Sequence, residues 1–322
     1  MVTSLEIPLV DPGANPIDLW RTIVSHGVAS LPPMSVDEDA RTLEMTLPVA
    51  RARPRTVLVG SGRPGFGVVE VRGRPPGRAA AADLLATIRH VLRLDEDLSG
   101  FYAAAAGDPE LAWAVAGAGR MIQSPTVFED VVKTVCTTNC SWALTERMVG
   151  ALVEHLGEPA VGAAPGGPAG RAFPTPAAMA SADESFYREV ARAGYRGPYL
   201  MALARSVASG DIDLEVLGRA PAEELSDEEV AERLMALPGV GPYAAAHTMM
   251  MLGRYSRLIL DSWTRPKYAR LTGRRAVKDA TIVRRFRRYG DYAGLAFWLF
   301  LTRDWVEETE AQQAEAFSEG PA

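Results

Sequence analysis

Short runs of alternating apolar and polar residues fill the first part of the chain and are separated by glycine and proline. Residues 41–47 alternate strictly, while residues 56–59 and 67–71 are short runs rich in β-branched side chains. Alternation with a period of two is typical of β-strands that bury one face. The pattern therefore predicts an antiparallel β domain over residues 1–78.

Apolar residues recur at helical spacing from residue 79 onward, which predicts an all-helical core over residues 79–310. The helices expected from this spacing lie at 82–92, 95–106, 127–136, 142–156 and 292–305. Glycine, alanine and proline dominate residues 157–170, which we interpret as a flexible insertion. Residues 311–322 form an acidic tail. The predicted fold class is α+β, with a small β-rich domain before a helical core.

The segment 227–253 predicts two helices joined by a tight turn. Ser226 followed three residues later by Glu229 has the spacing of a capping box, which starts the first helix. A proline ends that helix, and the Gly-Val-Gly turn at 239–241 needs the freedom in φ that glycine has. Pro242 then suits the first position of the second helix. Backbone N–H groups of such a turn can bind a phosphate without any charged side chain.

This segment, with its Leu-Pro-Gly-Val-Gly-Pro-Tyr sequence, resembles the helix-hairpin-helix motif of the DNA glycosylase superfamily that includes 3-methyladenine and 8-oxoguanine glycosylases. Members carry a catalytic aspartate roughly 20 residues beyond the hairpin, and Asp261 stands at that place. An aspartate here also suits the N-cap of a following helix, and the two roles are compatible. The resemblance implies that the hairpin contacts DNA through Leu237, Gly239, Val240 and Gly241.

Three further segments carry the resemblance. The pattern Ser-His-Gly-x-x-x-Leu-Pro-Pro from Ser25 resembles the small β domain that precedes the helical core in this superfamily. Asn139, in Val-Cys-Thr-Thr-Asn-Cys-Ser, matches the residue that enters the gap left by a flipped base. Tyr195 and Arg196 match a Gly-Tyr-Arg turn, which implies an aromatic wedge and a guanidinium for a phosphate or base edge. The alternatives are a helix cap for Asn139 and core packing for Tyr195.

Tyr243 departs from part of the superfamily. The 8-oxoguanine type has a lysine at this position that forms a Schiff base with the sugar, whereas the 3-methyladenine type has an aromatic residue. A phenol cannot form an imine, so Tyr243 predicts an enzyme without lyase activity. Lys267, six residues past Asp261, is a less favoured replacement for that amine.

Four residues are predicted to line the pocket for an extruded base. Tyr243 and His247 stand one helical turn apart and face the same way, although a partly buried helix histidine is the alternative for His247. The apolar helix at 292–305 flanks the base pocket in the superfamily. Phe297 and Trp298 are its candidates for stacking on the base, while most of that helix must be core.

Cleavage of a base from deoxyribose builds positive charge at the anomeric carbon, which a carboxylate stabilises while it orients water. Asp261 alone is sufficient for this, so we expect no metal and no organic cofactor, apart from a possible cation that bridges the hairpin turn to a phosphate. The predicted function is base-excision repair on double-stranded DNA with a damaged purine, with a slight preference for alkylated bases such as 3-methyladenine. The alternatives are a glycosylase/lyase for oxidised purines and a non-catalytic damaged-DNA-binding protein.

The 322 residues include 34 basic and 40 acidic side chains, a formal net charge of −6, which by itself does not indicate DNA binding. Residues 265–288, however, hold ten basic residues and one acidic residue, a local net charge of +9 directly after Asp261. Such a segment can attract phosphates while the acidic remainder limits nonspecific binding. The alternative is a solvated helix face with ion pairs along the helix.

Two cysteines, Cys136 and Cys140, are too few for a four-cysteine iron–sulfur cluster, and their spacing does not suggest a disulfide framework. The sequence has neither a signal peptide nor an apolar run of transmembrane length. We therefore expect a cytoplasmic monomer, associated with the nucleoid if bacterial, that does not contact membranes.

Overall fold

The computed structural model describes residues 3–305 of the chain. The acidic tail predicted at 311–322 lies outside this range. The N-terminal part forms one antiparallel sheet in the order β1-β5-β4-β3-β2. The strands are β1 (Thr3–Pro8), β2 (Met34–Asp37), β3 (Thr42–Val49), β4 (Ala52–Ser61) and β5 (Phe66–Val71). The predicted alternating run at 41–47 thus lies in β3, and the two predicted runs rich in β-branched residues lie in β4 and β5.

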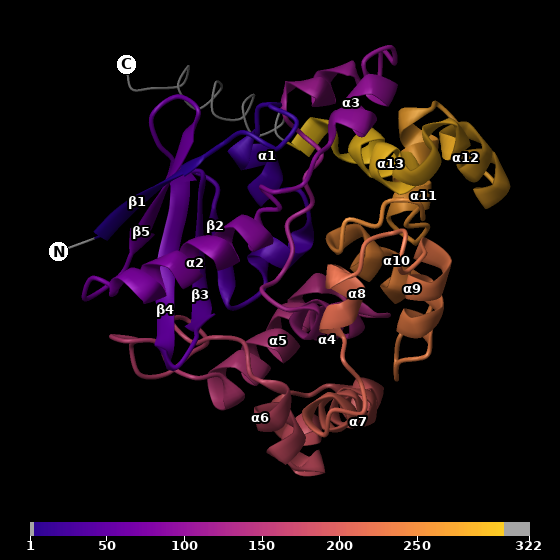
Figure 1. Cartoon of the computed structure of the whole chain (residues 1–322). Coiled ribbons are helices and arrows are strands. Elements are labelled where there is room, and N and C mark those ends of the chain that lie inside the picture. The colour runs from indigo at the N-terminus through magenta and orange to yellow at the C-terminus, as the bar shows by residue number, and fades with distance from the viewer. Residues whose placement is uncertain (1–2, 306–322) are drawn as a thin grey trace, which may run out of the picture.

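Cross-strand apolar pairs form the buried face of the sheet. Met45 pairs with Val57, and Val59 pairs with Val69, in register across three strands. Helix α2 (Arg78–Val91) lies across the sheet and buries its apolar stripe in the same cluster of side chains (Figure 1). The core of this layer therefore continues past residue 78 into α2.

Apart from α1 (Leu19–Ile23) and η1 (Gly27–Ser30), which pack in the sheet-side cluster, the remaining helices form a helical body beside the sheet layer (Figure 1). They include the predicted helices, with ends shifted by a few residues. Their bounds are α3 (Ser99–Ala105), η2 (Ala112–Ala116), α4 (Val127–Thr137), α5 (Trp142–Leu156), α6 (Pro176–Ser181), η3 (Phe186–Val190), η4 (Gly194–Arg196), α7 (Gly197–Ala208), α8 (Glu215–Arg219), α9 (Asp227–Met235), α10 (Pro242–Met251), α11 (Thr264–Leu271), α12 (Asp279–Phe286), η5 (Arg287–Tyr292) and α13 (Ala293–Thr302).

Helices α9 and α10 form the predicted hairpin. The Ser226 side chain accepts from the Glu229 backbone N–H, and the Glu229 carboxylate accepts from Ser226, so the capping box is present. Gly239 has a φ of 78°, the left-handed conformation that a tight turn needs, and Pro242 opens α10. Local sequence therefore determines the geometry of this turn.

Helix α10 is buried on every side because apolar residues occupy all of its faces. Ala245 and Met249 pack in the cluster formed mainly by α4, α5, α7 and α9. Met250 packs in a second cluster, which is formed mainly by α3, α11, α12 and α13. Met251 reaches the sheet-side cluster. The helix thus sits where three cores meet.

Residues 157–170, the predicted insertion, cross from α5 to α6 beside the sheet. Pro159 bridges to Arg171, and the Val161 backbone N–H donates to the Pro54 carbonyl on β4 at 3.3 Å. Its flexibility stays a prediction. Within the described part of the chain, no helix has the length and apolar character needed to cross a membrane.

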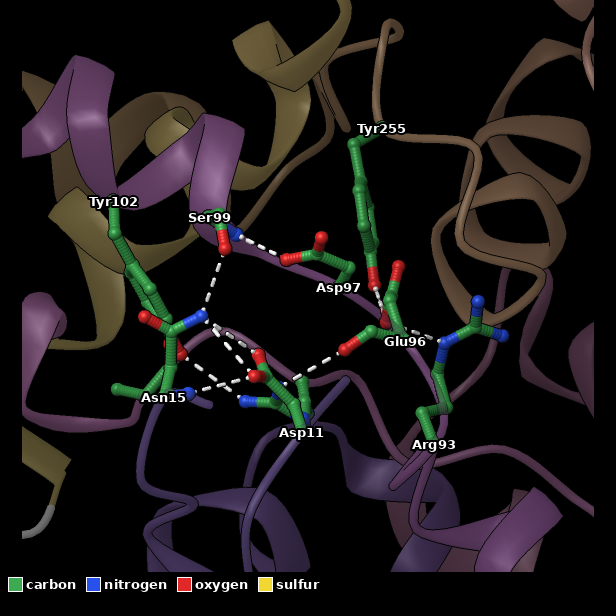
Figure 2. A network of polar contacts seen from close by, with 10 residues as sticks. Asp11, Asn15, Arg93, Glu96, Asp97, Ser99, Tyr102 and Tyr255 are labelled. Atoms are coloured by element: carbon green, nitrogen blue, oxygen red, sulfur yellow. Dashed lines mark hydrogen bonds and ion pairs between the residues drawn. The ribbon is translucent and has the colours of Figure 1, made fainter. Parts of the chain in front are cut away.

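A buried ion pair joins the N-terminal segment to the start of the helical body (Figure 2). Arg120 donates to the Asp11 carboxylate at 2.6 Å, and both side chains are fully buried. Arg120 also donates to the Tyr102 hydroxyl at 3.1 Å and to the Glu96 carbonyl at 3.0 Å. Asn15 donates to Asp11 as well, so the buried carboxylate is well satisfied.

A second group of hydrogen bonds in this network holds the C-terminal end of α10 in place. Arg93 donates to the Met251 carbonyl at 2.9 Å. It also pairs with Glu96 at 2.9 Å (Figure 2). Tyr255 donates its hydroxyl to the same Glu96 carboxylate at 2.9 Å. At Gly253, φ is 77°, and a Cβ there would lie 1.9 Å from the Arg93 guanidinium. Glycine at this position therefore permits both the turn and the close approach of Arg93.

We predict that Arg120→Met lowers the free energy of unfolding by about 3–5 kcal/mol, because it leaves the Asp11 carboxylate buried without its partner. Urea unfolding followed by circular dichroism measures this. The matched control is Arg219→Met, which removes the exposed pair between Arg219 and Asp213 and should cost less than about 1 kcal/mol. Equal effects of the two substitutions would contradict this role for the buried pair.

Candidate active site

A pocket of about 270 Å³ opens where the sheet layer meets the helical body. Its walls are mostly apolar and include five aromatic side chains besides two histidines. The lining residues are His26, Gly27, Val28, Leu31, Lys133, Thr134, Thr137, Trp142, Tyr243, His247, Met251, Asp261, Trp263, Trp298 and Trp305. A planar aromatic ligand would find stacking surfaces on several sides.

Asp261 lies at this pocket, on the loop that leads into α11. Its Oδ1 accepts from the Trp263 and Thr264 backbone N–H groups at 2.7 Å and 2.6 Å, while the Thr264 hydroxyl accepts from the Asp261 backbone N–H at 2.8 Å. Asp261 thus accepts two backbone hydrogen bonds at the start of α11, although Trp263 and not Asp261 occupies the N-cap position. The other carboxylate oxygen, Oδ2, lies 3.8 Å from His247 Nε2.

The pKa of Asp261 lies below its ordinary value. Partial burial acts to raise the pKa of this carboxyl, but the nearby His247 imidazole and the N–H groups of Thr264 and Trp263 outweigh it. Asp261 is therefore an anion at neutral pH. A fixed negative charge against an aromatic pocket can stabilise positive charge on a bound molecule.

Tyr243 and His247 both line the pocket from α10, with ring centroids 4.5 Å apart. Burial raises the pKa of the Tyr243 phenol, so it stays neutral, and its hydroxyl lies 3.4 Å from Thr137 Oγ1. His247 is buried and its Nδ1 lies 2.9 Å from Nε2 of His26. The predicted shared orientation is thus observed, while their role in holding a base stays a prediction.

Phe297 and Trp298 of α13 were both predicted to line the base pocket, but they lie in different surroundings. Trp298 lines the pocket, and its indole N–H donates to the Ser25 carbonyl at 2.8 Å. Phe297 is instead fully buried in the core, with its ring 5.2 Å from Phe286 and 6.1 Å from Tyr268. The prediction that Phe297 belongs to the base pocket is therefore wrong for this structure, because consecutive helix positions point in different directions.

Sequence reasoning missed several pocket residues, among them two tryptophans and a histidine. Trp142, at the start of α5, is partly exposed and packs beside Gly27. Trp305 lies behind Trp263, with ring centroids 6.0 Å apart. His26 comes from a segment 221 positions away from its partner His247, so no periodicity could have linked them. The Ser-His-Gly pattern at residues 25–27 was the available signal, and it indicated only the β domain.

A groove of about 570 Å³ adjoins the pocket and shares Asp261, Tyr243 and Trp263 with it. Asn139 and Tyr195 lie on the groove, and the Asn139 amide donates to the Tyr195 hydroxyl at 3.2 Å. Tyr195 is 53% exposed, so core packing does not explain it. The remaining groove residues include Gly239, Gly241 and Pro242. The groove thus joins the hairpin turn, the two polar side chains and the carboxylate.

Three side chains that were predicted to contact DNA are buried in the structure. The side chains of Leu237 and Val240 are buried in the helical core, so only their backbone groups remain available to a ligand. Arg196 is also buried, and its guanidinium donates to the Thr138 carbonyl and to Thr138 Oγ1. Its predicted contact with a phosphate or base edge is therefore wrong for this structure. It instead stabilises the turn that carries Asn139.

The basic segment 265–288 is partly neutralised by residues remote in sequence. Arg265 pairs with Asp279 within the segment, and Lys267 pairs with Asp304 at 2.8 Å. Further ion pairs join Arg285 to Glu110 and Arg288 to Asp108. Among the described residues, six basic side chains of the segment form no ion pair: Arg270, Arg274, Arg275, Lys278, Arg284 and Arg287. The available positive charge is smaller than the sequence count implied.

Neither Lys133 nor Lys267 presents a free amine to Asp261. Lys267 does not line the pocket, and its ammonium contacts both oxygens of Asp304. Lys133 does line the pocket, but it is buried and pairs with Glu129 at 2.6 Å. Sequence reasoning did not single out Lys133, because its pocket position depends on how α4 packs against α10.

No family model and no curated protein matches the sequence. Solved structures, however, share its fold over nearly the whole chain. One is a 3-methyladenine DNA glycosylase from Archaeoglobus fulgidus, with a TM-score of 0.69 and 20% identity over 94% of this chain and 99% of the other. The 8-oxoguanine glycosylase/lyase of Clostridium acetobutylicum gives a TM-score of 0.69 and 19% identity over 94% of this chain and 98% of the other.

The same Clostridium enzyme in complex with double-stranded DNA containing cytosine opposite 8-oxoguanine also has a TM-score of 0.69, at 19% identity over 96% of this chain and 98% of that one. The mixed α and β architecture, with an antiparallel sheet before a helical body, is thus a fold found among DNA glycosylases. The prediction of this fold class is confirmed at that level.

We predict that Gly239→Ala lowers the free energy of unfolding by about 1–3 kcal/mol, because its φ is 78° and an added Cβ would lie 2.9 Å from the Tyr199 ring. Gly241→Ala is the matched control, since φ at Gly241 is −103° and an added Cβ meets nothing within 4 Å. It should change stability by less than about 1 kcal/mol. Urea unfolding compares the two, and a larger loss for Gly241→Ala would contradict the turn geometry.

Proposed function

We propose that the protein is a DNA glycosylase of base-excision repair that hydrolyses the N-glycosidic bond of a damaged purine. The observation that carries this proposal is the Asp261 carboxylate, which is anchored by two backbone N–H groups between an aromatic pocket and a polar groove. A flipped base would occupy the pocket while its DNA strand follows the groove. The shared fold with known DNA glycosylases supports the proposal.

Asp261 would stabilise the oxocarbenium-like transition state and orient the attacking water. Its lowered pKa supports this role, because the carboxylate must be ionised when positive charge develops on the sugar. The reaction as proposed uses no metal and no organic cofactor. A cation that bridges the Gly239–Gly241 turn to a phosphate is compatible with it.

The DNA would be held by groups on the groove. Backbone N–H groups near Gly239 and Gly241 are suited to a phosphate, and Asn139 with Tyr195 is suited to the space left by the flipped base. An amide at that position can hydrogen-bond the orphaned partner base. The substrate would therefore be double-stranded rather than single-stranded DNA.

Two observations support a glycosylase without lyase activity. Tyr243 occupies the α10 position where lyase members of the superfamily carry a lysine, and its phenol stays neutral. The two nearest candidate amines, Lys133 and Lys267, are each engaged in ion pairs. An amine must be free and neutral to attack the sugar.

The pocket favours an alkylated base over an oxidised one. Electron-rich rings at Tyr243, Trp298 and Trp142 together with the anion of Asp261 suit a base that carries positive charge. A cationic 3-methylpurine also leaves without needing a proton. The shared fold does not distinguish between an alkylated and an oxidised base, because it occurs in both a 3-methyladenine and an 8-oxoguanine enzyme.

We predict that Asp261→Asn lowers the single-turnover rate of base release by about a thousandfold or more, because the amide cannot supply the negative charge. Binding to damaged duplex should be unchanged or slightly tighter, since an amide can still accept the two N–H groups. Gel-based cleavage and fluorescence anisotropy measure the two quantities. Asp291→Asn, an exposed control, should match the wild type. Retained turnover in Asp261→Asn would contradict the proposed role of this carboxylate in catalysis.

A panel of duplexes, each with one damaged base, tests the reaction itself. We expect strand breaks only after alkali treatment, greatest with an alkylated purine, and no adduct trapped by borohydride, because base release without lyase chemistry leaves an intact abasic strand. Breaks without alkali together with a trapped adduct would instead indicate a glycosylase/lyase. The lysine in that adduct would then be identified with Lys133→Met and Lys267→Met.

A further inference from the structure

Two histidines form a chain of polar contacts that leads to Asp261. The Val28 backbone N–H donates to His26 Nδ1 at 3.3 Å. His26 Nε2 lies 2.9 Å from His247 Nδ1. On the far side of the same ring, His247 Nε2 lies 3.8 Å from Asp261 Oδ2. This series of contacts therefore leads from the sheet layer through α10 to the Asp261 carboxylate.

The first contact determines where the protons lie. Burial and the neighbouring His247 lower the pKa of His26 to about 3, so His26 is neutral and carries one N–H. Its Nδ1 faces a backbone N–H and must accept, which leaves the proton on Nε2. His26 then donates to His247 Nδ1. A neutral His247 must in turn carry its proton on Nε2, which is directed at Asp261.

A charged His247 is incompatible with these hydrogen-bond directions. Protonated His247 would carry N–H on both nitrogens, so His26 Nε2 would have to accept from it. The single proton of His26 would then move to Nδ1 and face the Val28 N–H, and two donors would oppose each other at 3.3 Å. The anchored His26 thus disfavours both the charged form and the other neutral tautomer of His247.

The orientation of His26 is itself fixed by its surroundings. Its ring packs on Trp298 with centroids 5.6 Å apart and an interplanar angle of 31°. The preceding residue, Ser25, accepts the indole N–H of Trp298, and the following segment is held by buried Val28. His26 is therefore held from both sides against α13 and cannot turn without breaking these contacts.

The last donor in this series of contacts, His247 Nε2–H, has no acceptor in the part of the protein that the structure describes. Among the described residues, His247 Nε2 is buried and lacks a hydrogen-bond partner, because 3.8 Å to Asp261 is too long for a hydrogen bond. A buried donor without a partner costs free energy unless a ligand or water completes it. Its place beside Asp261 in the pocket suits an acceptor atom that arrives with the bound nucleotide.

We propose that His26 is a positioning residue, which holds His247 as the neutral tautomer with Nε2–H facing Asp261 and the substrate. This inference rests on the proposed function, since it assigns a role within the same site. Its consequence is electrostatic. With His247 neutral, Asp261 keeps its negative charge uncompensated, and a cationic transition state gains the full attraction. A protonated His247 would cancel much of that field.

Imidazole NMR tests the proton positions without any substrate. The chain has four histidines, so the ¹⁵N signals of His247 can be assigned by comparison with His247→Asn. We expect wild-type His247 to be protonated on Nε2 and unprotonated on Nδ1 between pH 6 and 8. A proton on Nδ1 of wild-type His247, or a charged ring at pH 7, would overturn the proposal.

Substitutions at His26 test its control of His247. His26→Phe removes the donor but keeps an aromatic ring, and it should give mixed His247 tautomers and protonation of His247 at higher pH. His26→Gln keeps an N–H at a similar reach and should restore the wild-type pattern. Unchanged His247 signals in His26→Phe would contradict the proposal. The other titratable groups around His247 in the pocket, Tyr243, Asp261 and Lys133, are present in every variant.

Base release supplies the second measurement. His26→Phe should lower the single-turnover rate by roughly tenfold, the worth of one lost hydrogen bond, with the largest loss at low pH. His26→Gln should recover most of the rate, and His155→Gln, on an exposed position of α5, is the control.

Three outcomes are distinguishable. An altered His247 tautomer with a wild-type rate would overturn the role of His26 in catalysis. Equal losses in His26→Phe and His26→Gln would indicate packing rather than proton position and would also overturn it. If wild-type protein cleaves no duplex in the panel, the proposed function fails, while the NMR result still tests the proton positions.

Discussion

The burial of helix α10 on every side is the constraint on which the rest of the structure depends. Its alanine and methionine residues enter three apolar clusters, so a shift of any one cluster would move the helix. Tyr243 and His247 are residues of this helix, and Arg93 donates a hydrogen bond to its C-terminal end. Helix α10 thus carries the pocket residues at a position that the whole molecule fixes.

The pocket requires all parts of the chain. The sheet layer supplies His26, α4 and α5 supply Lys133 and Trp142, and the C-terminal helix supplies Trp298. Polar contacts reinforce this assembly, since the fully buried pair of Asp11 and Arg120 would lose its stabilisation if the layers separated. The N-terminal layer therefore contributes to the site through the segment around η1, although its strands do not line the pocket.

Asp261 carries a negative charge in surroundings that disfavour charge. The apolar rings beside its carboxylate favour the neutral acid, whereas hydrogen bonds from two backbone N–H groups at the start of α11 favour the ionised form. A rigid anion of this kind, next to rings that can stack on a base, is suited to a reaction that builds positive charge on a sugar.

Sequence alone determined the features that depend on neighbouring residues. Alternation gave β3, runs rich in β-branched residues gave β4 and β5, the Ser226–Glu229 spacing gave the start of α9, and the glycine turn gave the conformation at Gly239, since each follows from local backbone chemistry. Asp261 was found because the hairpin segment resembles a glycosylase motif that an aspartate follows, and its catalytic role remains a proposal. Only tertiary structure decided which side chains meet. Arg196 proved buried, Phe297 turned into the core, and distant carboxylates neutralised part of the basic segment. His26 reached His247 across 221 positions, because contacts between layers depend on packing that no local pattern records.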